Sequence, residues 1–111
     1  MSTQNFFLTK DIEAKVVGEG VTRKVLAHNE DLMVCEVSFE TGSIGPMHQH
    51  PHTQSTYVKS GAFEFTINGV KQIVREGDTM YKEPNVLHGC VCLEKGVLID
   101  IFTPERKDFL A

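Results

Sequence analysis

The sequence predicts an all-β fold, a barrel or sandwich built from short strands. Hydrophobic residues recur mostly with a period of two, turn-forming pairs interrupt the chain at short and regular intervals, and helical patterns are scarce. The turn-forming pairs are Thr41-Gly42, Gly45-Pro46, Ser60-Gly61, Gly77-Asp78 and Pro84-Asn85. Because the 111 residues contain no repeat and no linker-like stretch, we expect one domain over residues 1–111.

Two strands are expected in the first half of the chain. Residues 21–27 form one, ended by a polar turn at residues 28–31. Residues 32–40 form the next, because apolar and polar side chains alternate along them. This alternation predicts a strand buried on one face, with Met33 and Phe39 on the buried side.

A hairpin and a further strand are predicted in the second half. Asn68-Gly69 separates residues 63–67 from residues 70–75, and this pair readily adopts the positive φ angles of a type I′ turn. Residues 97–102 are apolar on both faces except at Asp100, which predicts a strand buried on both sides.

Only two short helical segments are expected. Residues 12–16 have the composition of a single turn near the start of the chain. Thr103-Pro104 resembles an N-cap followed by proline at the first helical position, which predicts a short C-terminal helix through Leu110.

Composition and charge argue against several classes of partner. The net charge is −4 and lysine and arginine do not cluster, whereas nucleic acids and membrane surfaces attract basic patches. No apolar run approaches the roughly twenty residues of a membrane span, and the first residues lack the features of a signal peptide. Three cysteines are too few for a disulfide scaffold. We therefore expect a cytoplasmic protein with no nucleic-acid or membrane partner.

Two blocks of residues have the spacing of a metal site. His48 and His50 are two residues apart, so in a strand both side chains point to one face and can hold one ion. Gln54 shares their parity, and His88 would complete the site from a distant strand. Glycine, proline and asparagine accompany these ligands at turn positions, namely Gly42, Gly61, Gly77, Pro84 and Asn85. We expect one divalent metal ion, bound by neutral imidazoles.

Other polar residues have simpler interpretations. We expect His28 to be an ordinary surface or core histidine, and His52, which follows Pro51, to lie in the cavity wall. Cys90 and Cys92 share the parity of His88, and small buried hydrophobic residues are a better interpretation for them than thiolate ligands or nucleophiles.

Taken as a pair, the two blocks resemble the motifs of the cupin superfamily. The resemblance implies a jelly-roll barrel, also called a double-stranded β-helix, around the metal. The sequence departs from the motifs at Glu83, Asn85 and Cys92, where only backbone or packing is affected. It also departs at Gln54, where the motif usually has glutamate, and this change alters the chemistry of the site.

Three histidines and a glutamine form a ligand set without charge. The ion then keeps its full charge of +2, which favours Lewis-acid chemistry over oxygenation. Zinc, nickel, manganese and iron all accept imidazole and amide ligands, so the ligand set does not select among them.

A narrower resemblance is to the KdgF family, cupins of pectin and alginate breakdown. It covers residues 20–110 and includes Gln54 itself. The segments that carry it are residues 45–54, Tyr57-Val58, and residues 61–65, 84–94 and 98–110. The resemblance implies an enzyme that opens the ring of 4,5-unsaturated uronate monosaccharides, the products of polyuronate lyases, to linear 5-keto-4-deoxyuronate.

Such a reaction needs a base for the anomeric hydroxyl proton and an acid that protonates C4. Asp100 is the candidate, because a carboxylate on an apolar strand is costly without a task or a partner. Protection of a sheet edge and an ion pair with Arg106 are the alternatives. Arg106 is a candidate for the catalytic site and for binding the substrate carboxylate, or else a solvated arginine. Phe102 and Tyr57 are candidate contacts to the sugar.

Two other functions stay open at this point. A metal-dependent dioxygenase is disfavoured by Gln54, and a non-catalytic sugar-binding or sensory cupin is disfavoured because no DNA-binding segment accompanies the barrel. We also expect a homodimer, because sheet edges and the apolar segment Phe6-Phe7-Leu8 need cover.

Overall fold

The computed structural model describes residues 3–110; Met1, Ser2 and Ala111, which the single-domain prediction includes, lie outside the described residues. The strands are β1 (Lys15–Gly18), β2 (Val21–Asn29), β3 (Leu32–Phe39), β4 (Ile44–His48), β5 (Thr53–Ile67), β6 (Val70–Arg75), β7 (Thr79–Lys82) and β8 (His88–Thr103). Two single-turn 3-10 helices, η1 (Thr9–Asp11) and η2 (Lys107–Phe109), complete the chain. In the described part no helix has the length and apolarity needed to span a membrane.

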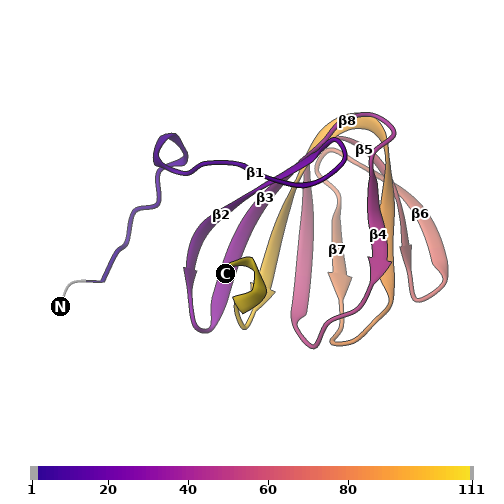
Figure 1. Ribbon diagram of the computed structural model, residues 1–111. Coiled ribbons are helices and arrows are strands. Elements are labelled where there is room, and N and C mark those ends of the chain that lie inside the picture. Colours follow the sequence, from indigo (N-terminus) through magenta and orange to yellow (C-terminus); the bar gives the residue numbers. More distant parts are fainter. Residues whose placement is uncertain (1–2, 111) are drawn as a thin grey trace.

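The eight strands form one continuous hydrogen-bonded sheet, which bends over into two facing halves, called the two sheets below, around a common interior (Figure 1). The long strands β5 and β8 belong to both sheets. The first half of β8 pairs with β4 and with the second half of β5, whereas its second half pairs with β3 and with the first half of β5. This arrangement confirms the predicted all-β barrel of jelly-roll type.

A bend in β5 and β8 lets each strand pass from one sheet to the other. The pairing register shifts between Val58 and Phe63, and Gly61 has a φ of +82° within this irregular stretch. Gly96 lies against the bend, and a Cβ at either glycine would collide with backbone atoms of the other strand. The turn predicted at Ser60-Gly61 is therefore wrong, because this pair forms a bulge inside one continuous strand.

The remaining strand predictions are largely confirmed. β3 buries Met33 and Phe39 on its inner face, and Asn68 and Gly69 have φ angles of 50° and 77°, as a type I′ turn requires. Burial of β8 on both faces is wrong in its second half, because Leu98 faces inward whereas Ile101 is 36% exposed on the outer face.

Both helix predictions are wrong in their extent. The first helical turn is η1, so residues 12–16 are extended and lead into β1. At the other end Thr103 is the last residue of β8, and its peptide bond to Pro104 is cis. Only η2 forms there, without a side-chain cap. Thr103 therefore continues the ladder of β8 instead of capping a helix.

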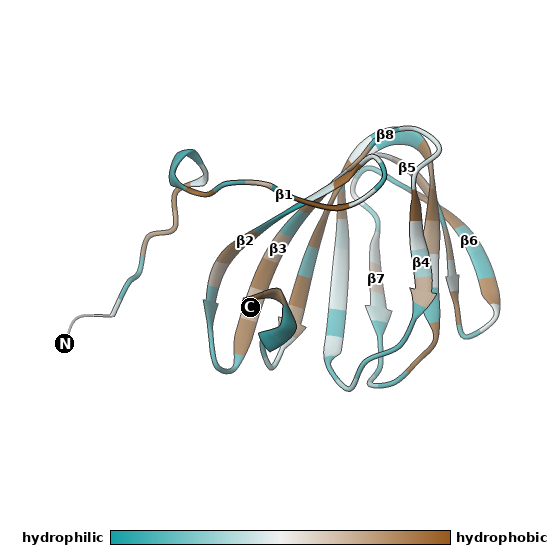
Figure 2. Ribbon diagram, viewed as in Figure 1, coloured by the Kyte–Doolittle hydropathy of each residue, from teal (hydrophilic) through white to brown (hydrophobic). Residues whose placement is uncertain are grey.

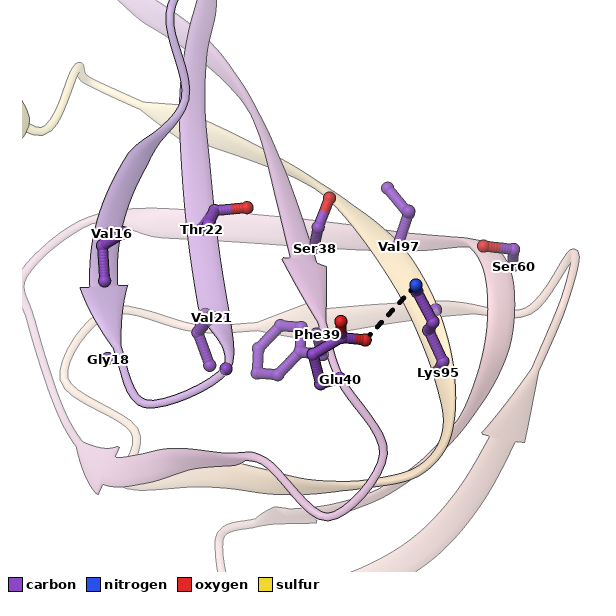
Figure 3. A pocket seen from close by; sticks show the side chains of 12 residues that line it. Val16, Gly18, Val21, Thr22, Ser38, Phe39, Glu40, Ser60, Lys95 and Val97 are labelled. Atoms are coloured by element: carbon purple, nitrogen blue, oxygen red, sulfur yellow. Dashed lines mark ion pairs between the residues drawn. The ribbon is translucent and has the colours of Figure 1, made fainter.

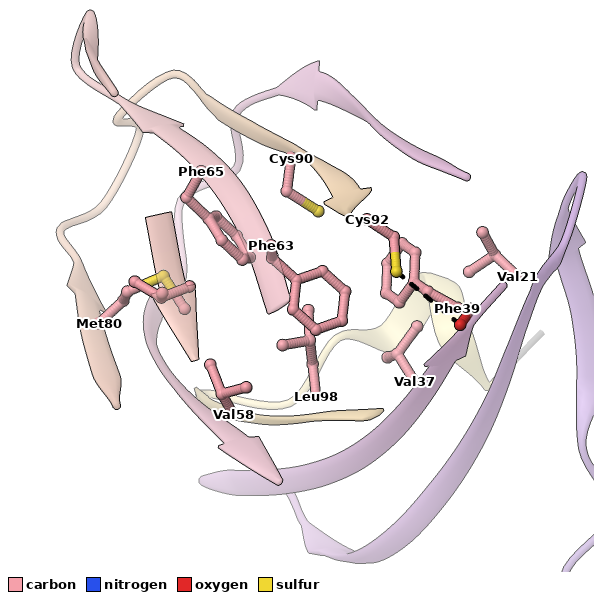
Figure 4. Close-up of a cluster of buried hydrophobic side chains, with 11 residues drawn as sticks. Val21, Val37, Phe39, Val58, Phe63, Phe65, Met80, Cys90, Cys92 and Leu98 are labelled. Atoms are coloured by element: carbon pink, nitrogen blue, oxygen red, sulfur yellow. Dashed lines mark hydrogen bonds between the residues drawn. The ribbon is translucent and has the colours of Figure 1, made fainter. Parts of the chain in front are cut away.

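The core fills the barrel between the two sheets (Figure 4). Phe39 and Phe63 meet edge to face with ring centroids 5.3 Å apart, and apolar colour follows the strands in alternation (Figure 2). A second cluster of Met33, Cys35 and Phe102 packs at the other end of β3. The polar site described next lies beside this second cluster, on a rigid frame of paired strands.

Candidate metal centre

Three histidines converge at one end of the barrel. His48 ends β4, His88 begins β8 directly opposite it in the pairing register, and His50 follows in the loop before β5. Each offers one ring nitrogen, and these three atoms lie within 4.8 Å of one another. The predicted meeting of residues from distant parts of the chain is present, and the three histidines could hold a metal ion.

Backbone carbonyls orient two of these rings. His48 Nδ1 lies 2.8 Å from the carbonyl oxygen of Pro46, and His88 Nδ1 lies 2.9 Å from that of Val86. Each Nδ1–H therefore donates to the chain two residues earlier and leaves Nε2 with a free lone pair. His88 Nε2 and His50 Nδ1 are buried without a hydrogen-bond partner among residues 3–110. Because unpaired buried nitrogens are costly, this arrangement fits a bound cation.

Burial keeps the imidazoles neutral. Desolvation lowers the pKa of His50 to about 4, and the positive charge of Arg106 acts in the same direction. Desolvation also lowers the pKa of His88 to about 4. Neutral imidazole is the form that binds metal, so both rings are ready for coordination at neutral pH.

Gln54 directs its amide oxygen toward the histidines. Its Oε1 lies 3.0 Å from His50 Nε2, while its Nε2 donates to Asp100 Oδ1 at 3.0 Å. Two ligand atoms about 2.1 Å from one ion and at a right angle would lie about 3.0 Å apart. If His50 binds the ion through Nε2, the Gln54 oxygen could thus be a fourth protein ligand, whereas if His50 binds through its unpaired Nδ1, its Nε2–H donates to Gln54 instead.

Asp100 is held by a short chain of hydrogen bonds. The Thr56 hydroxyl donates to Asp100 Oδ1 at 2.6 Å and accepts a hydrogen bond from Lys82 Nζ at 2.7 Å. Both bonds to the carboxylate end on Oδ1, since the Gln54 amide binds that atom too. Asp100 lies in β8 between β3 and β5, so it protects no sheet edge.

Arg106 is paired with a different acid. Its Nε and Nη2 donate to the two carboxylate oxygens of Asp108 at 3.1 and 3.0 Å, and it makes no ion pair with Asp100. Its guanidinium lies 4.3 Å from the ring centroid of Phe109 and 5.3 Å from that of Phe102. Neither of the structural alternatives for Asp100 is therefore realised.

A cavity of about 370 Å³ lies beside the histidine cluster. Its lining includes His48, His88, Gln54, Asp100, Phe102 and Arg106. This volume falls within the range of small-molecule sites, and the lining combines these polar groups with apolar side chains.

Comparison with known proteins identifies the family. The cupin-domain profile matches residues 35–102. The pectin degradation protein KdgF of Dickeya dadantii is 41% identical over 109 residues, which cover 96% of this chain and 99% of that protein. This chain belongs to the KdgF family of cupins.

Solved structures agree with this assignment. KdgF from Halomonas superposes on this cupin with a TM-score of 0.92 at 38% identity and covers 96% of this chain and 99% of that one. An RmlC-like cupin from Shewanella frigidimarina gives a TM-score of 0.92 at 36% identity over 96% of both chains. Oxalate decarboxylase of Bacillus subtilis, at 18% identity and a TM-score of 0.82 over 97% of this chain and 32% of its own, shares the fold alone.

The structure places three other candidates of this cupin outside the cavity. Tyr57 lies on the outer face of β5 and is 43% exposed, so it does not face a sugar bound in this cavity. His52 was expected in the cavity wall, but its Nε2 lies 3.2 Å from the carbonyl oxygen of Glu105 behind His50. Cys92 packs in the hydrophobic core.

The cysteines behave as small hydrophobic residues. Cys90 lines the cavity, and burial raises its pKa to about 11. Burial likewise raises the pKa of Cys35 to about 12, with the Asp100 carboxylate adding to the effect. At neutral pH both are thiols, which are poor metal ligands and poor nucleophiles.

Two cations beside the metal centre did not emerge from sequence reasoning. Lys82 is only 2% exposed, and burial lowers its pKa although the charge of Asp100 raises it. Arg23 lines the same cavity from β2. Strand parity could have indicated both residues. Lys82 lies two residues after the buried Met80 and Arg23 two residues after the buried Val21, so each shares a face of its strand with a buried residue.

A second hollow of this cupin, about 680 Å³, lies away from the histidines (Figure 3). It is lined by β1, the start of β2 and the end of β3. Its charged side chains are Glu40 and Lys95, which form an ion pair at 3.4 Å. Without a histidine, cysteine or free carboxylate in its lining, this hollow offers no comparable chemistry.

Proposed function

We propose that this cupin opens the ring of 4,5-unsaturated uronate monosaccharides to give linear 5-keto-4-deoxyuronate. The observation that carries the proposal is a cluster of three histidines that could hold a metal ion, two of which, His48 and His88, line one cavity together with Asp100 and Arg106. A full-length relative named for pectin degradation supports the same class of sugar-acid substrate.

His48, His50 and His88, with Gln54, would hold one divalent ion. Zinc, nickel, manganese or iron would all suit this neutral set of donors. When bound, the ion supplies Lewis-acid stabilisation of negative charge that develops on a substrate oxygen.

The reaction is an isomerisation, so protons move without net gain or loss. The bond between C1 and the ring oxygen breaks, the anomeric hydroxyl loses its proton as C1 becomes an aldehyde, and C4 gains a proton as C5 becomes a ketone. Asp100 is the residue that carries the proton from the hydroxyl to C4. Thr56 and Gln54 fix Oδ1, and Oδ2 accepts no hydrogen bond within residues 3–110, which leaves it for the substrate.

Arg106 and Phe102 orient the sugar in this proposal. Arg106 retains Nη1 for the substrate carboxylate while Asp108 holds the rest of the guanidinium in place. Phe102 is 2% exposed and lies edge to face with His50, so it forms the apolar wall against which the ring packs.

The other functions find less support. A dioxygenase would gain from a carboxylate ligand that helps a metal reach a higher oxidation state, and Gln54 supplies none. A purely sugar-binding cupin would not need a carboxylate with an open oxygen beside the metal ligands. Both observations favour the ring-opening enzyme.

We also propose a cytoplasmic setting and a homodimer. The three cysteines are free and buried, as suits a reducing compartment. A net charge of −4 is consistent with a small-molecule substrate and with no nucleic-acid partner. The exposed apolar side chains of the N-terminal arm, Phe6 and Leu8, support the homodimer.

The direct test uses the substrate itself. Metal-loaded protein is incubated with the unsaturated monosaccharide released by a pectin or alginate lyase, and the ultraviolet absorbance of the enol ether is followed. We expect faster loss of absorbance than in a control without protein, with no consumption of oxygen. A decay equal to that control would remove the ring-opening proposal, and oxygen uptake would favour the dioxygenase.

A further inference from the structure

We propose that Arg23 is a second residue that binds the substrate carboxylate, and that it selects uronates over neutral sugars. This inference rests on the proposed function, because it names the specificity determinant of the same cavity. It concerns a residue on β2, remote in sequence from both metal-binding blocks.

The register of the sheet places Arg23 in the cavity. Arg23 pairs with the buried Val37 of β3 and lies two residues after the buried Val21, so it shares the inner face of β2 with Val21. It shares the cavity lining with Asp100 and Arg106. A charged side chain at an inward position needs a partner or a ligand.

Arg23 has no such partner within residues 3–110. Arg106 uses two of its nitrogens on Asp108, whereas no side-chain hydrogen bond or ion pair involves the Arg23 guanidinium. Instead it lies 3.5 Å from the ring centroid of Phe109. The donors of Arg23 therefore remain available, and its planar fork matches a carboxylate.

The charges around the cavity favour an anion. Arg106 approaches the same Phe109 ring at 4.3 Å, so two guanidiniums lie close together on one aromatic side chain. Lys82 adds a third cation to the lining, whereas the lining contains two acids, Asp100 and Glu19, and Asp108 pairs with Arg106 from outside it. Burial and the nearby Arg106 lower the pKa of Arg23 while Cys35, Asp108 and Asp100 raise it, and a bound carboxylate would further favour the charged guanidinium.

The test compares Arg23→Gln with the wild type and with Arg75→Gln, an exposed arginine on β6 outside the cavity lining. Binding of galacturonate, which is a saturated uronate, and of galactose is measured by calorimetry on metal-free and metal-loaded protein. We expect Arg23→Gln to weaken galacturonate binding about 10- to 100-fold, the effect of losing a hydrogen-bonded charge pair, and to leave galactose binding unchanged. Arg75→Gln should match the wild type.

Kinetics with the unsaturated uronate supply a second readout. Arg23→Gln should raise KM by a similar factor while kcat changes less than about threefold, because the substrate carboxylate is charged before, during and after ring opening, so the contact with it is uniform along the reaction. Arg23→Lys keeps the charge without the fork and should fall between the two, which preserves the test if the glutamine variant folds poorly. Wild-type KM and wild-type galacturonate affinity in a folded Arg23 variant would overturn the inference.

The outcomes also separate this inference from the proposed function. A wild-type protein that binds galacturonate through Arg23 but does not open the unsaturated ring would contradict the ring-opening proposal and support the carboxylate site. An active wild-type protein that binds galacturonate more tightly than galactose, with both affinities unchanged in Arg23→Gln, would contradict the role of Arg23 alone.

Discussion

Hydrogen bonds decide which atom of each polar side chain faces the cavity. The Gln54 amide shows this well, since its nitrogen donates to Asp100 and its oxygen turns toward His50. A glutamate at this position would place a second carboxylate oxygen 3.0 Å from Asp100 Oδ1, where two negative charges repel. Glutamine avoids this repulsion beside Asp100, the proposed proton carrier.

At the scale of single residues, the main prediction concerns Asp100. Asp100→Asn should lower turnover about 10²- to 10⁴-fold, the usual worth of a general acid–base residue, because an amide cannot carry the proton. Asparagine has nearly the same shape and can still accept hydrogen bonds from Thr56 and Gln54, so melting temperature and metal content should stay near wild type. Single-turnover kinetics together with metal analysis check this.

Arg106→Ala is the matched comparison for Asp100→Asn. Loss of a carboxylate contact should raise KM more than it lowers kcat. If the Asp100→Asn protein were stable and fully active, another group would have to carry the proton. Equal and modest losses of rate in both variants, with lower melting temperatures, would indicate a structural role for both residues.

The histidines predict how the stability of metal-free protein depends on pH. The folded-state pKa of His50 and His88 is about 4, below the unperturbed value of about 6.5, so between these values the unfolded chain binds more protons. Stability is therefore complete above pH 6.5 and falls as the pH is lowered toward 4, by up to about 3 kcal/mol for each histidine.

Urea unfolding of metal-free protein at pH 7.5, 6 and 5 measures this dependence. His50→Gln removes one of the two titrating groups, so its stability should fall less steeply with pH than that of the wild type. Equal slopes for the two proteins would contradict the assignment of a lowered pKa to His50. Added divalent metal should stabilise the wild type most at the highest pH, where protons do not compete for the ligands.

At the scale of secondary-structure elements, the bend shared by β5 and β8 brings the two sheets together. Gly61 and Gly96 lie at this bend, where each backbone comes too close to the other for a side chain to fit. The bend allows one half of each strand to join each sheet, and so lets β4, which carries His48, pair with β8, which carries His88.

Gly61→Ala should therefore be severely destabilising. Its Cβ would lie 2.6 Å from backbone atoms of Glu94, Lys95 and Gly96, in addition to the strain of its φ of +82°. Gly42 is a matched control, since it has a φ of +87° with no atom within 4 Å of a Cβ. Gly42→Ala should cost about 1–2 kcal/mol for backbone strain alone, and Gly61→Ala should cost at least about 2 kcal/mol more.

Urea unfolding of both glycine variants gives the comparison. Similar free energies of unfolding for Gly61→Ala and Gly42→Ala would show that the strands can separate at the bend without penalty. The metal content of the Gly61 variant should also fall, because His48 and His88 depend on the pairing that the bend allows.

At the scale of the whole molecule, the N-terminal arm extends away from the barrel (Figure 1). Phe6 is 81% exposed and Leu8 49%, and all four residues of the edge strand β1 are exposed, including Val16 at 75%. Apolar side chains on an extended arm and an uncovered strand edge are typical of an interface with a second copy. We therefore predict a homodimer held by the arm and β1.

Light scattering at micromolar concentration measures this assembly. The wild type should have twice the mass of one chain, and a double substitution of Phe6 and Leu8 by serine should shift the mass toward that of a monomer. Val70→Ser is the control, because Val70 is 67% exposed on β6 and lies outside the arm. A monomeric wild type would refute the prediction.

Local sequence pattern by itself determined the strands and the core of the site. Alternation over residues 32–40 predicted the buried face of β3, and Asn68-Gly69 predicted the hairpin. The two histidines do meet as their spacing predicted, although His50 lies in the loop after β4 and not in one strand with His48. These features depend on the side-chain period of two and on local φ preferences, which are properties of short segments.

Only the tertiary structure decided what depends on closure of the barrel. It brought Lys82 and Arg23 to the cavity, turned Tyr57 outward, made Ser60-Gly61 a bulge instead of a turn and paired Arg106 with Asp108. Each of these outcomes depends on strand pairing or on packing that the local pattern does not specify. Parity assigns a side chain to one of two faces, but which face lines the cavity, and at what height, follows from the long-range register of the strands.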